Sequence, residues 1–350
     1  MISDIWQKLA GQDKPIVLYG MGNGADKILS VFERYGIKAS GIFASDGFVR
    51  DKYFHGMRLD SYGGICEKFS DFTVVVSFAS HLPEVIENVN RISHERELVI
   101  PEVPVVADAE LFNIEFYEKN KSEISKAREL FSDEYSKALF DSIIEYRLWG
   151  QAEALFRLTC KPEEIFGKII HPEKIKRYAD AGAYTGDTIR ELQNFGAELE
   201  YVLALEPDKR SYKKLIENTK NIKIFDARNE GAWSEKCVLE FNGGLGRGSV
   251  LGNGNERIAM CDIDSALDGM PVDYIKYDVE GCEERSLLGS KKTICEYAPC
   301  LCVSLYHRSE DIFKIPILIS KMQNEYSFYL RRFYCMPAWD LNLYAVKRGD

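Results

Sequence analysis

Short apolar runs alternate with amphipathic runs through the first third of the chain. The apolar runs have the length of buried strands and cover residues 15–19, 38–43, 73–78 and 97–100. Residues 26–35 and 83–92, which separate some of these runs, read as helices. This alternation of strands and helices predicts a small doubly wound, Rossmann-like α/β domain over residues 1–112.

The next segment has the pattern of helices alone. Residues 115–158 contain a single glycine, Gly150. Apolar side chains recur there at three- and four-residue spacing and form one stripe: Leu130, Phe131, Tyr135, Leu139, Ile143 and Ile144. Ser132, followed by two acids, is a helix-start signal that divides the segment into two helices. We expect residues 113–168 to be a helical connector whose stripe packs the two α/β domains together; a partner-binding helix is the alternative.

A second series of strands and helices fills residues 169–350. The predicted strands are residues 175–179, 201–205, 222–226, 273–281, 300–306, 328–333 and 341–346, and the predicted helices are 187–195, 208–219 and 311–323. Pro316 marks the first turn of the last helix or a kink in it. The closing strands look like an antiparallel pair. The pattern therefore predicts an α/β domain with a mixed seven-stranded sheet.

One stretch of this second domain stands apart from the pattern. Residues 241–255 hold six glycines around Arg247, without the strand-to-helix context of a phosphate-binding loop. A mobile hairpin tip is the simplest interpretation, and a lid over a substrate is the alternative.

Composition narrows the class of protein. The chain has 350 residues, of which 45% are hydrophobic and 29% charged, and its formal net charge is -10. These values favour a globular, cytoplasmic protein of about two domains and argue against non-specific nucleic-acid binding. No apolar run approaches the length of a membrane span, and the first residues lack the apolar core of a signal peptide. The nine cysteines show no C-x-x-C pair, so reduced thiols are expected.

The stretch Y-A-D-A-G-A-Y-T-G-D-T at residues 178–188 carries the first candidate chemistry. It reads as a strand end, a tight turn with Gly182 and Gly186, and the start of a helix. Asp180 stands two residues before the first glycine, where a carboxylate would repel the pyrophosphate of a dinucleotide. S-adenosylmethionine carries an ammonium and a sulfonium instead, and both would be attracted to this carboxylate. A purely structural turn is the alternative.

A second acid follows at the end of the next predicted strand. Glu206, before Pro207, is placed to accept both ribose hydroxyls of an adenosine. Asn229 follows the third strand. It either contacts the adenine or has only a structural role in packing. The expected cofactor is S-adenosyl-L-methionine, and the expected contacts are Asp180, Gly182, Tyr184, Thr185, Gly186, Thr188, Glu206, Pro207, Asn229 and Asp278.

A third group of polar residues falls at the ends of two later strands. Asp278 and Glu280 are two residues apart in D-Y-I-K-Y-D-V-E-G, so along a strand they would share a face. His307 ends the next strand at the same edge. We expect these three residues to be catalytic, with His307 as the general base because its ordinary pKa lies near neutrality. There are two alternatives: His307 is a structural histidine, or the two acids hold a divalent cation. Two carboxylates alone are few ligands for a cation, so no metal site is expected.

The N-terminal domain has its own glycine loop. G-M-G-N-G-A follows a predicted strand, and Gly20, Gly22 and Ala25 fit the dinucleotide fingerprint G-x-G-x-x-[GA]. A nucleotide or nucleotide-sugar at this loop and a purely structural turn both remain open. If the loop bound a nicotinamide cofactor, the protein would be an oxidoreductase, although the sequence shows no hydride-transfer constellation. A non-catalytic scaffold protein is a further alternative.

The motifs together resemble a known family. Residues 170 to 347 are similar to the FkbM family of S-adenosylmethionine-dependent methyltransferases through D-A-G-A-Y-T-G-D-T at 180–188, L-E-P at 205–207, I-K-Y-D-V-E-G at 275–281 and S-L-Y-H-R-S-E-D at 304–311. The resemblance implies a class I methyltransferase fold and O-methylation of a hydroxyl on a sugar or secondary metabolite. Tyr184 stands where many members carry Asn, and Cys282 where many carry Ala. Residues 1–112 resemble the nucleotide-binding domains of bacterial sugar acetyltransferases and capsule-synthesis enzymes, which suggests a role in polysaccharide modification.

Overall fold

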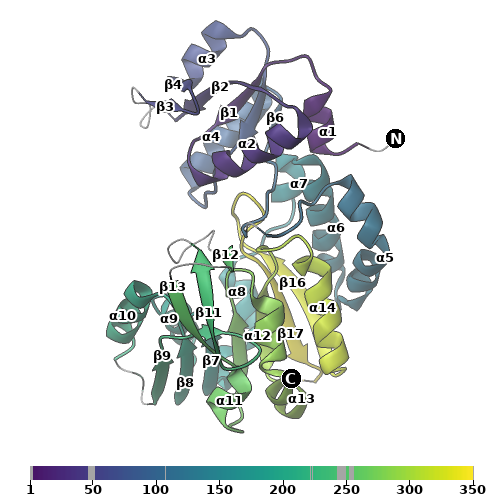
Figure 1. Ribbon diagram of the computed structural model, residues 1–350. Helices are drawn as coiled ribbons and strands as arrows, with labels where there is room; N and C mark the ends of the chain where they lie inside the picture. Colours follow the sequence, from purple (N-terminus) through teal and green to yellow (C-terminus); the bar gives the residue numbers. More distant parts are fainter. Residues whose placement is uncertain are drawn as a thin grey trace.

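The computed structural model describes residues 3–45, 52–106, 108–220, 222, 224–242, 250–251 and 256–349 (Figure 1). An N-terminal α/β unit lies at the top of Figure 1, a larger α/β unit lies below it, and helices α5 (Ile114–Leu130), α6 (Glu134–Trp149) and α7 (Ala152–Phe156) join them along one side. None of the helices within these ranges is long and apolar enough to cross a membrane.

The N-terminal unit is built on a six-stranded sheet. Its strand order is β3-β4-β2-β1-β5-β6, and all neighbours are parallel except β3 and β4. The strands are β1 (Ile16–Tyr19), β2 (Ala39–Ala44), β3 (Tyr53–Phe54), β4 (Met57–Ser61), β5 (Thr73–Val76) and β6 (Leu98–Val99). The helices are α1 (Ile5–Ala10), α2 (Asn23–Tyr35), α3 (Tyr62–Lys68) and α4 (Pro83–Glu95). The predicted doubly wound Rossmann-like architecture is confirmed. Helices α1 and α3 and the β3–β4 hairpin are present in addition to the predicted elements.

The connector helices pack against the C-terminal unit. Helix α5 lies against α14 (Asp311–Met322), and α6 lies against the edge strand β16 (Tyr326–Arg332). The N-cap of α6 is Asp133, whose carboxylate accepts from the amide of Ser136. The expected helix start at Ser132 is therefore one residue early. Ser132 instead exchanges two hydrogen bonds with the backbone of Phe328, which fastens the connector to β16.

The C-terminal unit contains the expected mixed seven-stranded sheet. Its order is β16-β17-β15-β14-β7-β8-β9, and only β17 (Leu341–Lys347) runs antiparallel to its neighbours. The remaining strands are β7 (Arg177–Ala181), β8 (Tyr201–Leu205), β9 (Phe225–Arg228), β14 (Tyr274–Tyr277) and β15 (Cys300–Ser304). This is the mixed seven-stranded sheet, closed by an antiparallel pair, that the sequence predicts.

Helices cover both faces of this sheet because alternate strand residues point to opposite sides. One face packs on α8 (Pro162–Ile165), the π-helical turn η2 (Phe166–Ile170), α9 (Asp187–Asn194) and α10 (Lys209–Asn218). The other face packs on α12 (Glu283–Leu288), α13 (Lys291–Tyr297), α14 and the connector. Buried residues of this second face, the connector and the N-terminal sheet form one continuous hydrophobic core, as expected for the apolar stripe of the connector.

A small four-stranded sheet flanks the large one. Its order is β10-β13-β11-β12, from β10 (Gly231–Ala232), β11 (Cys237–Asn242), β12 (Val250–Leu251) and β13 (Glu256–Cys261), and α11 (Ile263–Leu267) follows it. β11 and β12 pair as an antiparallel hairpin. The expected glycine-rich tip or lid, at residues 243–249 and 252–255, lies outside the described residues.

A buried arginine ties the connector to both units. Arg147 of α6 is fully buried, and its Nε lies 2.8 Å from an oxygen of Glu102 in the segment after β6. Its terminal nitrogens donate to the carbonyl oxygens of Ser309 and Leu305, which follow β15. A buried charge with this many partners fixes the relative position of the segments it joins.

We therefore predict that Arg147→Met destabilises the protein by about 3–5 kcal/mol, because the substitution leaves the buried carboxylate of Glu102 without its cation. Arg128→Ala is the matched control: Arg128 binds Asp141 through two nitrogens, but this pair is exposed, so about 1 kcal/mol or less is expected. Urea unfolding followed by circular dichroism measures both. Equal losses for the two variants would contradict the role assigned to Arg147.

Candidate functional site

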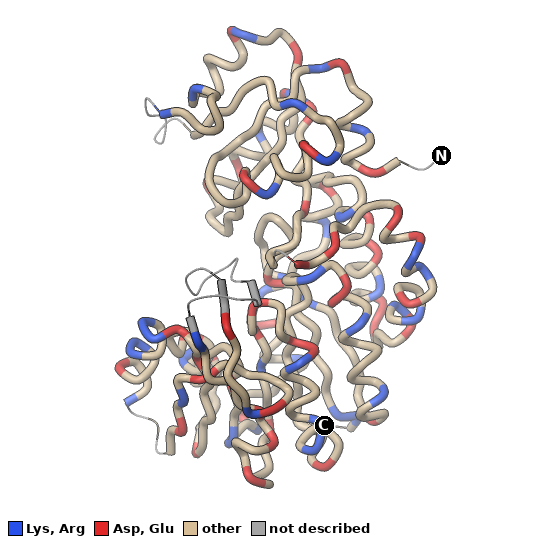
Figure 2. Tube along the Cα trace, in the orientation of Figure 1, with Lys and Arg blue, Asp and Glu red and all other residues tan. Residues whose placement is uncertain are grey.

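The candidate site lies at the carboxyl ends of four adjacent parallel strands. β15, β14, β7 and β8 are neighbours in the sheet, so the segments that follow them meet at one edge. These segments carry the sequence-predicted acids and His307. Figure 2 shows acidic and basic residues mixed over both units of the chain.

The glycine loop after β7 packs tightly against the end of β14. Gly182 has φ 88°, and a Cβ at this position would overlap the carbonyl oxygen of Asp278. Gly186 has φ 77° and caps the N-terminus of α9. Between the two glycines, Tyr184 also has a positive φ of 45°, and its side chain is 57% exposed. The sequence-predicted turn is thus present, and glycine is required at 182 because two backbones touch there.

Asp180 is a buried carboxylate in β7. It is 1% exposed, and neither of its oxygens accepts a hydrogen bond from any residue that the structure describes. Burial raises its pKa to about 6, although the ammonium of Lys276 opposes this shift. Lys276 lies directly across the β7–β14 pair from Asp180. A buried carboxylate whose oxygens accept no hydrogen bond is costly even beside a lysine, which makes Asp180 a candidate ligand-binding group.

Glu206 is held in a fixed orientation after β8. One carboxylate oxygen accepts from the amide of Asp208 at 2.8 Å, and the other accepts from the amide of Tyr184 at 2.8 Å. Burial nevertheless raises its pKa to about 7. Each oxygen keeps a second lone pair, so an ionised Glu206 can still accept hydrogen bonds from two hydroxyls.

The remaining predicted cofactor contacts support this loop system. Both amide hydrogens of Asn229 are used, because its Nδ2 donates to the carbonyl oxygens of Glu206 and Pro207. Asn229 therefore braces the turn after β8 and has only its Oδ1 left for an adenine. The carbonyl of Thr185 accepts from Asn218 of α10, and Thr188 is half-buried in the first turn of α9.

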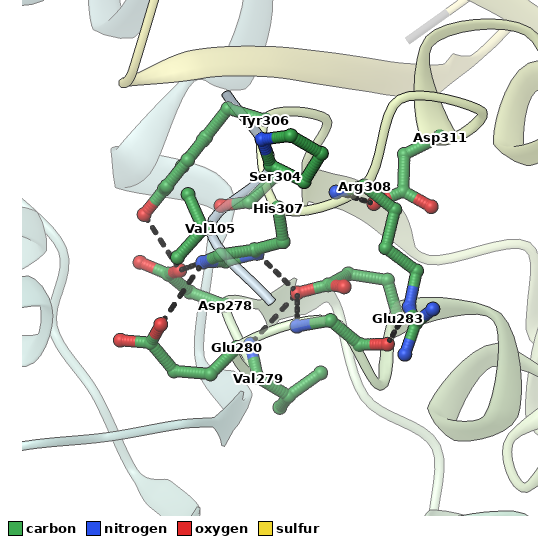
Figure 3. A network of polar contacts seen from close by, with 12 residues as sticks. Val105, Asp278, Val279, Glu280, Glu283, Ser304, Tyr306, His307, Arg308 and Asp311 are labelled. Carbon is green, nitrogen blue, oxygen red and sulfur yellow. Dashed lines mark hydrogen bonds and ion pairs between the residues drawn. The ribbon is translucent and has the colours of Figure 1, made fainter. Parts of the chain in front are cut away.

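A second cluster surrounds His307 (Figure 3). His307 is 0% exposed, and its Nδ1 lies 2.8 Å from Oε1 of Glu283. Its Nε2 lies 3.6 Å from Oδ1 of Asp278 and 3.5 Å from Oε2 of Glu280. The three predicted catalytic residues do meet. They do not meet through strand alternation, however, because β14 ends at Tyr277 and Glu280 lies in a turn with φ 51°.

The charges around His307 change its expected protonation. Burial alone would lower its pKa, but Glu283, Asp278 and Glu280 outweigh burial and raise its pKa to about 9. The premise of an ordinary histidine pKa was therefore wrong, since this imidazole carries a proton near neutral pH. Glu283 was not predicted. In the sequence, Glu283 is marked only as an acid two residues after the motif I-K-Y-D-V-E-G. It is the first residue of α12 and is fully buried.

Asp278 is the most strongly ionised acid of the cluster. Burial opposes its charge, but Lys276 and His307 outweigh burial and hold its pKa at about 2. Lys276 Nζ lies 3.2 Å from one oxygen of Asp278, and the hydroxyl of Tyr306 donates to the other at 3.1 Å. The edge therefore holds a fixed carboxylate beside the glycine loop.

The N-terminal glycine loop borders a cavity between the two units. Gly20 and Gly22 have φ near 105°, as such a loop requires, whereas Ala25 is buried inside the domain. The close approach is made by Gly24, where a Cβ would overlap the carbonyl oxygen of Ser77. The cavity has a volume of about 320 Å³, and its walls include Met21, Gly24, Ser77, Phe78, Val105 and Trp339.

We predict that Gly182→Ala destabilises the protein far more than Gly196→Ala does. Both glycines have positive φ, and this conformation alone costs alanine about 1–2 kcal/mol. Only at Gly182 would the new methyl group also collide with the backbone of Asp278; Gly196 has open space around it. Thermal unfolding of the two variants tests this, and similar losses would show that the β7 and β14 segments are not in contact.

Comparison with known proteins bears on the whole chain. No family profile and no curated sequence matches it. A crystal structure of methyltransferase FkbM from Methylobacillus flagellatus KT superimposes with a TM-score of 0.74 at 17% identity, covering 97% of this chain and 92% of that one. A putative methyltransferase from Streptococcus mutans in complex with SAH matches with a TM-score of 0.34 at 13% identity, covering 54% of this chain and 99% of that one. Aeropyrum pernix fibrillarin with bound S-adenosyl-L-methionine matches with a TM-score of 0.33 at 12% identity, covering 52% of this chain and 71% of that one. The chain thus has the fold of an FkbM methyltransferase over nearly its whole length, including the N-terminal unit.

Proposed function

We propose that this protein is an S-adenosylmethionine-dependent methyltransferase that acts on a hydroxyl of a sugar or secondary metabolite. The observation that carries the proposal is the buried carboxylate of Asp180, whose oxygens accept no hydrogen bond from the described residues, together with the preoriented carboxylate of Glu206. The fold, which matches that of an FkbM methyltransferase, supports this function.

The donor set fits S-adenosylmethionine better than a dinucleotide. Asp180 would attract a cationic amino acid moiety, whereas it would repel a pyrophosphate. The free lone pairs of Glu206 suit the two ribose hydroxyls of an adenosine. A Cβ at Gly182 would overlap the carbonyl oxygen of Asp278, and one at Gly186 would press on Thr219 and Leu215, so glycine lets this loop lie close to its neighbours. This fit weighs against a nicotinamide-dependent oxidoreductase and against a scaffold without a ligand.

The catalytic work of the chain is mainly positioning. S-adenosylmethionine, when bound, supplies a methyl group already activated by a sulfonium. Asp278 and Glu280 offer acceptor oxygens at the adjoining strand end and would orient a hydroxyl by accepting its hydrogen bond. His307, which is fixed by Glu283, holds these two carboxylates in place. In this role His307 is a positioning residue.

We predict that Glu206→Gln weakens S-adenosylmethionine binding by about 1.5–3 kcal/mol, because a charged acceptor of the ribose hydroxyls is lost. The pKa of Glu206 is about 7, so the affinity of the unsubstituted protein should fall as the pH drops below 7, where this carboxyl gains a proton. Titration calorimetry with S-adenosylmethionine, S-adenosylhomocysteine and NAD between pH 5.5 and 8.5, on the order of one unit to either side of that pKa, measures both effects.

Glu217→Gln, on the exposed face of α10, is the control and should bind like the unsubstituted protein. Unchanged affinity in Glu206→Gln, or affinity for NAD alone, would remove the assignment of the cofactor site.

The cavity of the N-terminal unit suggests which acceptor is used. It lies at the carboxyl ends of β1 and β5, where the strand order of the sheet reverses, and such points commonly bind nucleotides. Val105 lines this cavity, and its amide donates to the carbonyl oxygen of His307. A nucleotide-sugar held by the loop of Gly20 and Gly22 would therefore have its sugar directed toward the His307 cluster.

We expect UDP-sugars to bind the protein and to be methylated in the presence of S-adenosylmethionine, with mass spectrometry detecting the added methyl group. Asp278→Asn should lose most of this product while S-adenosylmethionine affinity is kept, because Asp278 acts on the acceptor. If UDP-sugars fail to bind at millimolar concentration, the N-terminal loop is a structural turn and the acceptor is of another class.

A further inference from the structure

The loop between β16 and β17 joins the C-terminal unit to the N-terminal unit. Met336 in this loop exchanges two backbone hydrogen bonds, of 2.8 Å and 2.9 Å, with Ser80, which follows β5. Arg332, at the end of β16, is fully buried and donates to the carbonyl oxygens of Leu155 and Cys335. These contacts hold the loop in one position relative to both units.

This loop also supplies one wall of the cavity at the N-terminal glycine loop. Pro337 and Trp339 line the cavity, and the other described residues of its wall belong to the N-terminal unit or to the segment after β6. Trp339 is partly exposed. Its ring lies next to that of Tyr306, with centroids 6.4 Å apart and an interplanar angle of 31°. Trp339 is therefore the side of the cavity that is closest to the His307 cluster.

Tyr306 connects Trp339 to the carboxylates at the sheet edge. The hydroxyl of Tyr306 donates to Oδ1 of Asp278 at 3.1 Å, and its ring centroid lies 4.1 Å from that of His307 (Figure 3). The side chains of Asp278 and Glu280 are both partly exposed, so a ligand can reach their oxygens. A single aromatic ring thus separates the cavity wall from the carboxylates that we assign to the acceptor hydroxyl.

An indole ring in this position suits a sugar ring. The C–H groups on one face of a sugar are apolar and weakly positive, so they pack well on the electron-rich face of an aromatic ring. The hydroxyls of a sugar packed in this way point sideways, where polar groups can bind them. Sites for small molecules commonly combine apolar and aromatic walls with a few polar groups that fix orientation. Trp339 and the two carboxylates provide these two parts.

A uracil base can also stack on an indole ring, but the position of Trp339 favours the sugar. The loop of Gly20 and Gly22, which would hold the nucleotide, belongs to the opposite, N-terminal side of the cavity. Trp339 lies beside Tyr306, at the side where the reacting hydroxyl has to be. A uracil base has no aliphatic hydroxyl, so the part of the ligand next to Trp339 should be the sugar.

We propose that Trp339 is the surface on which the sugar ring of the acceptor packs, and that it selects sugars among the hydroxyl compounds that reach Asp278 and Glu280. This inference rests on the proposed function and assigns a residue to its acceptor specificity. Trp339 binds the acceptor without taking part in the reaction. Its loss should therefore raise KM for a sugar acceptor more than it lowers kcat. The affinity for S-adenosylmethionine should not change, because the cofactor acids follow other strands, β7 and β8.

The test uses the full chain with UDP-glucose and UDP as probes, in calorimetry and tryptophan fluorescence. Trp339→Leu should weaken UDP-glucose binding about five- to tenfold and leave UDP binding unchanged, whereas Trp339→Phe, which keeps an aromatic face, should lose less. UDP-glucose should alter the fluorescence of the unsubstituted protein, and Trp339→Phe should remove this change. Trp149→Leu is the matched control, because Trp149 of α6 is also partly exposed but lies outside the cavity wall; it should keep both affinities.

Thermal unfolding shows whether each variant is folded, and Trp339→Phe serves as the test if Trp339→Leu does not fold. Equal weakening of UDP and UDP-glucose would assign Trp339 to the base and overturn the proposal. Unchanged binding of UDP-glucose, or no binding to the unsubstituted protein, would also overturn it. Calorimetry with S-adenosylmethionine on the same samples separates the two hypotheses. Cofactor binding without an effect of Trp339 rejects only the sugar surface, and an effect of Trp339 without cofactor binding rejects only the methyltransferase.

Discussion

The burial of several charges at one sheet edge is the constraint on which the rest of this structure depends. Asp180, Asp278 and Lys276 lie on the adjacent strands β7 and β14 or directly after them, and Lys276 offsets the two acids on either side of it. Burial alone would lower the pKa of Lys276, but Asp278 and Asp180 hold it above its ordinary value. Such an arrangement is stable only if the strands keep their register, because a shift of one residue would leave each buried charge without its partner.

The parts of the fold that depend on local pattern were predictable from the sequence. β8 was predicted with its observed bounds, and the antiparallel β16–β17 pair follows from two strand patterns with no helix between them. The meeting of the acids and His307 was also predictable, because parallel strands present their carboxyl ends at one edge. The small elements α1, α3 and the β3–β4 hairpin were missed, since runs of two to seven residues give little periodic signal.

The properties that depend on distant neighbours were not predictable. The pKa of His307 is set by three carboxylates, and Glu283 among them acts because the start of α12 lies beside the segment that follows β15. The role of Asn229 likewise depends on the turn after β8, whose carbonyl groups take both of its amide hydrogens. Residue type and spacing indicate which groups reach the site, whereas burial and hydrogen-bond partners decide their protonation and use.

The N-terminal unit is connected to this edge by specific contacts. The segment between β6 and α5 passes beside the His307 cluster: Val105 donates to the backbone of His307, and Asp108 binds Arg308, whose Nε donates to the carbonyl of Gly281. The same segment lines the cavity at the N-terminal glycine loop through Val103 and Val105. A ligand that moves this segment would thus act on the turn that carries Glu280 and on the strand end that carries His307. The two α/β units are therefore in direct contact at this edge, through the segment between β6 and α5.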